Sequence, residues 1–242
     1  TLFQTCALPI PRVGEPSQRG EVMGSTITFD GATGFLAGDS GPAVLVIQEW
    51  WGLVPQIEAV CERYADAGFT ALAPDFYGGR TTAEPDEAGK LMMELDVPQA
   101  MTVARSALDL LASRSGRSDL GVSGYCMGGG LALLIGCAHP DVVKAVVPYY
   151  GLIPWPGSAP DYGQMAAAVQ GHFAELDVYF SPAAATTLET TLRAAGREVE
   201  MFVYPATHHA FANDVRPEVF DAAATDLAWQ RTTEFFRRHL VS

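Results

Sequence analysis

The chain has 242 residues, of which 48% are hydrophobic and 18% are charged, a composition that excludes intrinsic disorder for the chain as a whole. Asp and Glu number 28 against 15 Lys and Arg, so the formal net charge is −13 and nucleic-acid binding is not expected. The four cysteines form no CxxC pair and have no histidine at zinc spacing, so we expect free thiols, no metal and a cytoplasmic location.

Residues 1–22 contain several turn-forming residues and no hydrophobic period, and we expect a loosely attached leader before a single domain over residues 23–242. A hairpin is predicted next, because Asp30-Gly31 separates two short strand-like runs, at residues 26–29 and 33–37. Two apolar runs then predict buried strands, at residues 43–47 and 69–73. Between them, Pro55 begins a predicted helix that runs to Ala67.

The remainder of the chain alternates between helical and extended patterns. Residues 78–97 are rich in Gly, Pro and charge and predict a long loop with a short helix. Further strands are predicted at residues 120–124, 143–150 and 198–204, and further helices at residues 98–113, 128–138, 182–195 and 218–239. This alternation predicts an α/β fold, with a mostly parallel central sheet flanked by helices on both faces.

One uncharged stretch, Leu120 to Ala138, is long enough to need a membrane check. It contains six glycines, a density that is rare in a membrane-spanning helix. A strand, a tight turn and a buried helix explain the stretch better, so no contact with a membrane is expected.

The strongest local motif is Gly124-Tyr125-Cys126-Met127-Gly128, between a predicted strand and a predicted helix. It has the form of the nucleophile elbow G-x-S-x-G with cysteine in place of serine. Glycines two residues on either side of the nucleophile avoid a collision on the strained turn, and the following helix favours a thiolate. We therefore interpret Cys126 as a nucleophile, and Ser123, which lacks the flanking glycines, as a structural hydroxyl.

A cysteine nucleophile needs a base and an acidic group that orients the base, and in this fold both follow later in the chain. His208 and His209 come directly after the last predicted strand, and position alone leaves either as the base. The acidic candidates are Glu175 and Asp177, with Asp161 less constrained, and Asp177 could equally be a turn or capping residue.

The whole pattern resembles the dienelactone hydrolase family of α/β-hydrolases. The matching segments follow the family's order over about residues 25–240: Gln48-Glu49-Trp50-Trp51-Gly52, Ala73-Pro74-Asp75-Phe76-Tyr77, Gly124-Tyr125-Cys126-Met127-Gly128-Gly129, Tyr149-Tyr150-Gly151, Phe173-Ala174-Glu175-Leu176-Asp177 and His209-Ala210-Phe211. The resemblance implies a lactone- or ester-cleaving enzyme with the α/β-hydrolase fold and no cofactor.

The resemblance also implies roles for individual residues. Cys126 would be the nucleophile, His209 the base and Asp177 the residue that orients it, and Glu49 would help to generate the thiolate. The backbone amides of Trp50 and Met127 would form the oxyanion hole.

Further positions would line the substrate pocket, namely Trp51, Tyr150 and Tyr179. Arg80 lies one position from the first of two arginines with which the family holds a substrate carboxylate. The second position is the neutral Asn213, so the resemblance leaves the nominal lactone substrate in question.

From these observations we predict a hydrolase of a small lactone or ester that acts through a Cys-His-Asp triad and a thioester intermediate. The alternatives are a broad carboxylesterase for small activated esters, a thiol redox protein, and a non-catalytic binding protein with a hydrolase fold. The expected partner is a small-molecule substrate, and we expect a monomer, with a dimer as the alternative.

Overall fold

A computed structural model describes residues 24–240, and within them eight strands form one sheet in the order β1-β2-β4-β3-β5-β6-β7-β8. The β1–β2 hairpin is present as predicted, and β2 pairs with β4 in the antiparallel sense, whereas all pairs from β4 to β8 are parallel. The strands are Ser25–Phe29, Ala32–Ala37, Ala43–Ile47, Thr70–Pro74, Leu120–Tyr125, Val143–Tyr149, Ala168–Ala174 and Val199–Tyr204. The predicted fold class, an α/β-hydrolase with a mostly parallel sheet, is confirmed.

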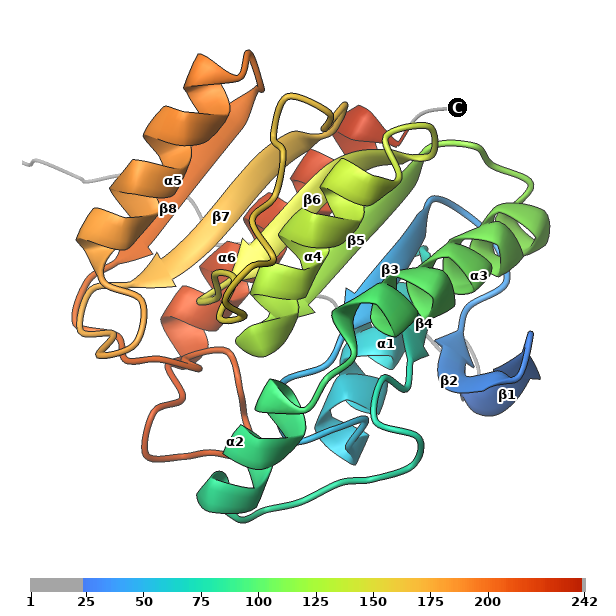
Figure 1. Ribbon diagram of the computed structural model, residues 1–242, viewed down its shortest axis with the longest axis horizontal. Helices are drawn as coiled ribbons and strands as arrows, with labels where there is room; N and C mark the ends of the chain where they lie inside the picture. The colour runs from blue at the N-terminus through green and yellow to red at the C-terminus, as the bar shows by residue number, and fades with distance from the viewer. Residues whose placement is uncertain (1–23, 241–242) are drawn as a thin grey trace, which may run out of the picture.

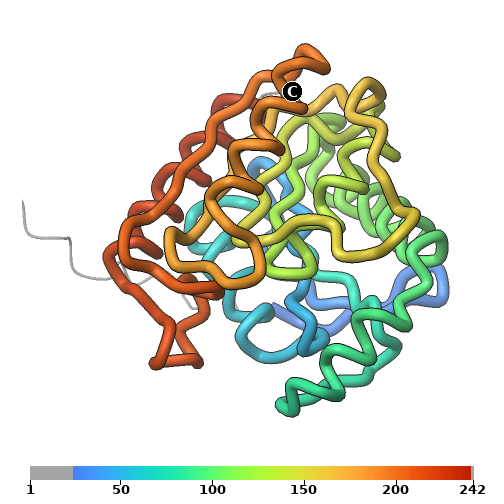
Figure 2. Tube along the Cα trace, turned by 60° about the vertical axis from the view of Figure 1, so that its left-hand side comes forward, coloured from blue at the N-terminus to red at the C-terminus, as the bar shows by residue number. Residues whose placement is uncertain are grey.

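Helices cover both faces of this sheet (Figure 1). On one face, α3, α4 and α5 pack against the strands, and on the other face lie α1 and α6. Figure 2 shows the same layers from another side, with α3 in green and α6 in red on opposite sides of the strands. In chain order, α1 to α6 span Pro55–Asp66, Pro85–Met93, Val97–Ser115, Met127–Ala138, Pro182–Ala194 and Ala222–His239.

Burial of the strands explains the apolar runs in the sequence. Every residue of the central strands β3 and β4 is buried, because helices cover both of their faces. The edge strand β1 is mostly exposed and alternates polar with apolar residues. The uncharged stretch 120–138 forms β5 and α4, as predicted.

The last helix begins later than predicted, at Ala222 instead of residue 218. Asp221 caps it, because its carboxylate accepts a hydrogen bond from the Ala224 N–H at 2.8 Å. The preceding residues form turns in which the Arg216 carbonyl accepts hydrogen bonds from Val219 and Phe220. The capping residue Asp221, which lies inside the predicted range 218–239, therefore marks where the helix begins.

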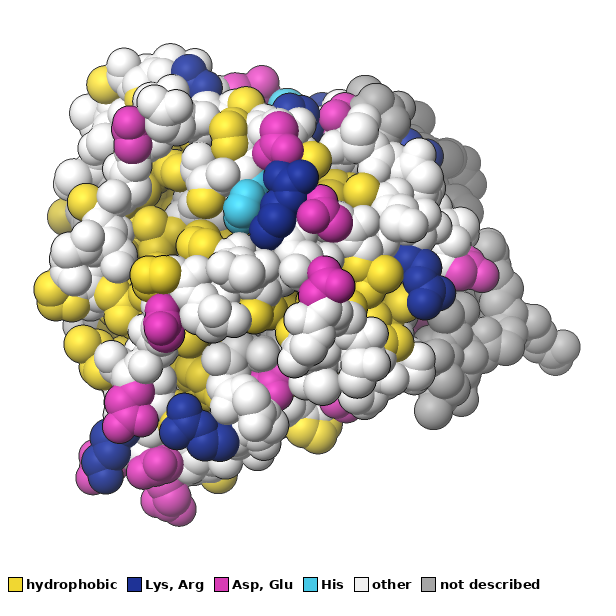
Figure 3. Space-filling view, turned by 45° about the vertical axis from the view of Figure 1, so that its right-hand side comes forward, with side chains coloured by type: hydrophobic (Ala, Val, Ile, Leu, Met, Phe, Trp, Pro, Cys, Tyr) yellow, Lys and Arg dark blue, Asp and Glu magenta, His cyan; other side chains and the backbone are white. Residues whose placement is uncertain are grey.

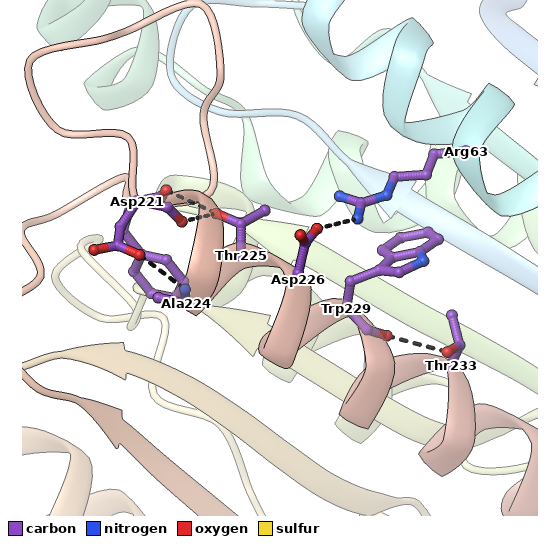
Figure 4. Close-up of polar contacts among 8 residues, drawn as sticks. Arg63, Asp221, Ala224, Thr225, Asp226, Trp229 and Thr233 are labelled. Atoms are coloured by element: carbon purple, nitrogen blue, oxygen red, sulfur yellow. Dashed lines mark hydrogen bonds and ion pairs between the residues drawn. The ribbon is translucent and has the colours of Figure 1, made fainter. Parts of the chain in front are cut away.

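Helices α1 and α6 are distant in sequence, and their side chains pack together on the same face of the sheet (Figure 4). The Tyr64 ring of α1 packs on the Trp229 ring of α6 with centroids 4.5 Å apart. Arg63 lies over the same indole and pairs with Asp226 at 3.1 Å. The Tyr64–Trp229 contact is part of the hydrophobic core on this face of the sheet.

Acidic and basic side chains lie intermixed with hydrophobic ones on the face shown in Figure 3. Among residues 24–240, no helix is long and apolar enough to cross a membrane. The proposed leader, residues 1–22, lies outside the described residues.

Candidate active site

Cys126 sits on a strained turn between β5 and α4. Its backbone has φ 55° and ψ −121°, a conformation that non-glycine residues rarely adopt. A Cβ on Gly124 would overlap the carbonyl of Gly128, and a Cβ on Gly128 would lie 2.5 Å from the carbonyl oxygen of Gln48. Both flanking glycines are therefore required by backbone packing, and together they hold the sulfur at the start of α4.

Two backbone amides near Cys126 are available to a bound oxyanion. Met127 is the first residue of α4, where helical N–H groups have no partner within the helix. Trp50 follows β3, the strand beside β5 in the sheet. Among the described residues, neither amide has a hydrogen-bond partner. Both lie at the carboxyl edge of the parallel strands, where ligands of open α/β sheets bind.

A carboxylate and an imidazole from different loops meet beside this turn. Asp177 follows β7, and its Oδ2 lies 2.8 Å from Nδ1 of His209, which follows β8. The other oxygen, Oδ1, accepts hydrogen bonds from the N–H groups of Tyr179 (2.8 Å) and Phe180 (3.0 Å). Asp177 is thus fixed on both sides, while the alternative base, His208, is exposed.

The electrostatic environment of His209 favours its protonated form. Burial alone would lower its pKa, but the hydrogen bond to Asp177 and the interactions with Cys126 raise that pKa to about 10. The imidazole also packs against the Tyr150 and Tyr179 rings, with centroids 5.2 and 5.0 Å away. The structure therefore brings Cys126, His209 and Asp177 into one interacting group.

Glu49 is buried beside this group and carries two hydrogen bonds. The Tyr150 hydroxyl donates to Oε1 at 3.3 Å and the Asn213 amide donates to Oε2 at 2.9 Å. Burial raises the pKa of Glu49, and the charge of His209 together with these two donors opposes that rise. Tyr150 and Asn213 thus act on the carboxylate of Glu49.

A cavity of about 680 Å³ opens over the sulfur. Its walls come from the segments after β3, β5, β6, β7 and β8 and from α2. Besides Cys126, His209 and Glu49, they include Trp50, Trp51, Leu176, Val178, Tyr179 and Arg216. The volume is within the range of pockets that hold small molecules.

Comparison with known proteins identifies the family of the chain. The model of the dienelactone hydrolase family matches residues 30–240. The chain belongs to the dienelactone hydrolase family. Membership makes it a hydrolase of the class that cleaves carboxylic esters and lactones.

Two bacterial relatives are similar over most of their length. One, "Protein usf" of Aquifex pyrophilus, is 32% identical over 209 residues, covering 83% of this chain and 90% of its own. The other, from Aquifex aeolicus and named "Putative carboxymethylenebutenolidase", is 32% identical over 214 residues with the same coverage. Among solved structures, a dienelactone hydrolase-like promiscuous phosphotriesterase, P91, has a TM-score of 0.80 at 20% identity, covering 90% of this chain and 98% of its own.

Arg80 and Asn213 occupy the positions at which the family is expected to hold a substrate carboxylate, and neither lines the active-site pocket. Arg80 points its guanidinium toward Glu94 (3.7 Å) and the Tyr77 carbonyl (3.3 Å) and is not part of the pocket wall. Asn213 is 2% exposed and its amide is committed to Glu49. Tyr150 is likewise fully buried and does not line the pocket, whereas Trp51 and Tyr179 do.

Sequence reasoning missed Arg216, the cation that does line the pocket. Its guanidinium lies 6.0 Å from the centroid of the Trp51 ring and bonds Glu218 at 2.8–2.9 Å. The sequence did contain one indication of this placement: Arg216 lies seven residues after His209, in the same connection between β8 and α6.

The other thiols of the described chain differ from Cys126 in environment. Burial raises the pKa of Cys61 well above its ordinary value and raises that of Cys137 to about 12. Both are free, and neither lines the pocket. They behave as small apolar side chains.

Proposed function

We propose that the chain hydrolyses a small lactone or ester through a Cys126–His209–Asp177 triad and a thioester intermediate. The observation that carries this proposal is the Asp177–His209 pair at 2.8 Å, next to a cysteine on a strained elbow at the floor of a pocket.

In the first half of the reaction, the Cys126 thiol passes its proton to His209, whose surroundings favour the protonated ring. The thiolate attacks the carbonyl carbon, and the carbonyl oxygen gains negative charge that the amides of Trp50 and Met127 stabilise. As the C–O bond breaks, His209 gives its proton to the leaving oxygen. The acyl group remains on sulfur as a thioester.

The second half uses the same histidine as a base. Two of the influences that raise the pKa of His209 come from Cys126, and they vanish when the sulfur is acylated. The pKa of His209 then falls, and the neutral ring accepts a proton from water as that water attacks the thioester. As the C–S bond breaks, the carboxylic acid leaves and the Cys126 thiolate forms again, while the proton taken from water remains on His209, and this restores the starting pair.

Glu49, which lines the pocket, supports this cycle. Its charge interacts favourably with the imidazolium of His209, while Tyr150 and Asn213 hold both of its oxygens. We assign it the role of stabilising the charged pair before substrate binds.

The broad-carboxylesterase alternative receives support from the charges of the site. The relative in Aquifex aeolicus is named for lactone cleavage, and carboxymethylenebutenolide substrates carry a carboxylate. Here Arg80 faces Glu94 and Arg216 is bonded to Glu218, so each cation already has a carboxylate partner. Uncharged activated esters therefore fit this pocket at least as well as an anionic lactone does.

The test compares wild type with Cys126→Ala on dienelactone and on p-nitrophenyl acetate. We expect Cys126→Ala to lose about a thousandfold or more in kcat/KM on both, and wild type to accumulate an acetyl group on Cys126, detected by intact mass and peptide mapping. Retention of activity in Cys126→Ala would refute the triad. Binding without turnover by wild type would favour the non-catalytic alternative.

We further propose that the enzyme works as a monomer in the reducing cytoplasm. A thiol nucleophile requires a reducing compartment to stay active, and Cys61, Cys126 and Cys137 are all free.

A further inference from the structure

Three exposed apolar side chains border the active-site pocket on one side. Leu176, Val178 and Tyr179, which follow β7, are 46%, 85% and 66% exposed and all line the pocket, and we call them the apolar rim. Other large hydrophobic side chains are exposed in the described part of the chain, but they lie apart in sequence and outside this pocket: Met93, Val203, Val215 and Leu227. Single exposed hydrophobic residues are common, whereas a group of them beside a pocket indicates a binding surface.

Backbone hydrogen bonds fix the direction of the rim side chains. The Leu176 N–H donates to the Thr207 carbonyl at 2.9 Å, and the N–H groups of Tyr179 and Phe180 donate to Oδ1 of Asp177. The Asp177 side chain points inward and is fully buried, while the residues on either side of it are exposed. This turn fixes directions but not residue types, since polar side chains suit exposed positions at least as well. The apolar residues therefore need a second reason, which an apolar ligand supplies.

The rim begins beside the group that protonates the leaving oxygen. Nδ1 of His209 is bonded to Asp177, so Nε2 remains to serve the substrate. The centroids of the Tyr179 and Phe180 rings lie 5.0 and 5.9 Å from that of the imidazole, and both residues line the pocket. A general acid must come within about 3 Å of the oxygen that it protonates. The atoms attached to the leaving oxygen therefore start next to these two rings.

Charges on this side of the pocket do not favour a charged leaving group. Within residues 176–180, Asp177 is the only charged residue, and its oxygens are used by His209 and by backbone N–H groups. Arg216, the cation of the pocket wall, is bonded to Glu218. The leaving group that fits here is therefore uncharged and apolar.

We propose that the apolar rim binds the leaving group of the substrate, and that the enzyme prefers esters of apolar alcohols or phenols to esters of small ones. This inference rests on the proposed hydrolase function and names its substrate class. Contact with the rim removes apolar surface from water while the C–O bond breaks, so kcat/KM should rise with the apolar size of the leaving group. The acyl group, in contrast, starts at the sulfur of Cys126.

The test uses phenyl acetate and two isomeric esters that each contain four more carbons. In 4-butylphenyl acetate these carbons belong to the leaving group, and in phenyl hexanoate they belong to the acyl chain. The two acetates release phenols of similar acidity and form the same acetyl-enzyme, so their kcat/KM values compare the acylation step. For each longer ester, kcat/KM is expressed relative to that of phenyl acetate.

The variants remove the rim and leave the triad unchanged. They are Val178→Ser and Leu176→Ser/Val178→Ser, in which Asp177 and the Tyr179 ring are retained. The matched control is Val203→Ser, which alters an exposed valine of β8 outside the pocket. Because all three positions are exposed, each variant should fold, which circular dichroism verifies.

We expect wild type to prefer 4-butylphenyl acetate over phenyl acetate by about tenfold, and this preference to fall about threefold in Val178→Ser and to disappear in the double variant. Val203→Ser should leave it unchanged, and the relative value for phenyl hexanoate should change less than about twofold in every variant. An unchanged preference, with phenyl acetate still hydrolysed, overturns the inference and leaves the proposed function intact. An equal fall for phenyl hexanoate also overturns it, because the rim would then hold acyl chains as well.

A binding measurement separates failure of the two proposals. If wild type hydrolyses none of the three esters, the proposed function fails, and binding of 4-butylphenol is then measured by saturation-transfer NMR. The proteins compared are wild type, Leu176→Ser/Val178→Ser and Val203→Ser. Transfer that is lost only in the rim variant supports a rim that binds apolar phenols. Transfer that is absent from wild type, or equal in all three proteins, overturns it.

Discussion

Two histidines, the partly buried His209 that lines the pocket and the fully buried His172 within β7, face opposite electrostatic surroundings. Both use Nδ1 in a hydrogen bond of 2.8 Å, His209 with the carboxylate of Asp177 and His172 with the hydroxyl of Tyr204. Nε2 of His172 meets two more neutral groups, the Gln170 amide oxygen at 3.1 Å and the Thr232 hydroxyl at 3.0 Å.

Their proton affinities differ accordingly. Burial, assisted by the charge of Arg231, lowers the pKa of His172 to about 3. Burial also acts against the charged form of His209, yet the hydrogen bond to Asp177 and the nearby sulfur raise its pKa to about 10. The charge of the partner, more than burial, decides whether a buried imidazole carries a proton. One histidine is thereby suited to stabilising the fold and the other to moving protons.

The largest effect is expected when His209 receives a neutral partner like that of His172. Asp177→Asn should lower the pKa of His209 well below 10 and reduce kcat/KM by about a thousandfold, because the imidazolium loses its counter-charge and its orienting acceptor. The measurement is the pH profile of p-nitrophenyl acetate hydrolysis. Asp161→Asn, which alters an exposed acid outside the pocket, is the control. A loss of less than tenfold in Asp177→Asn would contradict this assignment.

The reverse exchange gives His172 a charged partner. Thr232→Asp places a carboxylate where the hydroxyl now lies 3.0 Å from Nε2, and should raise the pKa of His172 above its value of about 3. Thr232→Asn has nearly the same shape without the charge and should leave His172 neutral. NMR titration of the imidazole protons distinguishes the two variants. Equal pKa values in both would show that burial dominates after all.

The smallest effect is the pH dependence of stability that His209 confers. Its pKa is raised on folding from about 6.5 to about 10, so its contribution is complete below pH 6.5 and is lost as the pH rises through 10. The free energy of unfolding of wild type relative to His209→Gln should therefore decrease by about 1–3 kcal/mol between pH 6.5 and 10.5. Urea denaturation across this range measures it. A difference that grows with pH would mean that the imidazole is neutral in the folded protein.

The turn that carries Cys126 could be predicted from the sequence, because its steric requirements are local. Gly124 and Gly128 flank Cys126 because backbone atoms occupy the space of their missing side chains, and this demand appears as a short motif. The alternation of strands and helices likewise predicted the parallel sheet, since each apolar run is long enough only for a buried strand.

The orientation of side chains that depend on partners distant in sequence could not be predicted from the sequence. Arg80 turns to Glu94 at the end of α2, and Asn213 turns inward to Glu49, 164 residues away in sequence. Arg216 reaches the pocket through the turns that precede α6, the segment that the sequence assigned in part to a helix. Such placements follow from tertiary packing and leave no period or motif in the chain.

The contact between α1 and α6 has a consequence for synthesis of the protein. Arg63 and Asp226 are separated by 163 positions, so the aromatic face of α1 has no covering helix until α6 has been made. At about 5–20 residues per second, a ribosome needs roughly ten to thirty seconds for that interval. During this time Tyr64 and the strands beneath it present an open apolar surface, and chaperone binding to nascent chains should concentrate there.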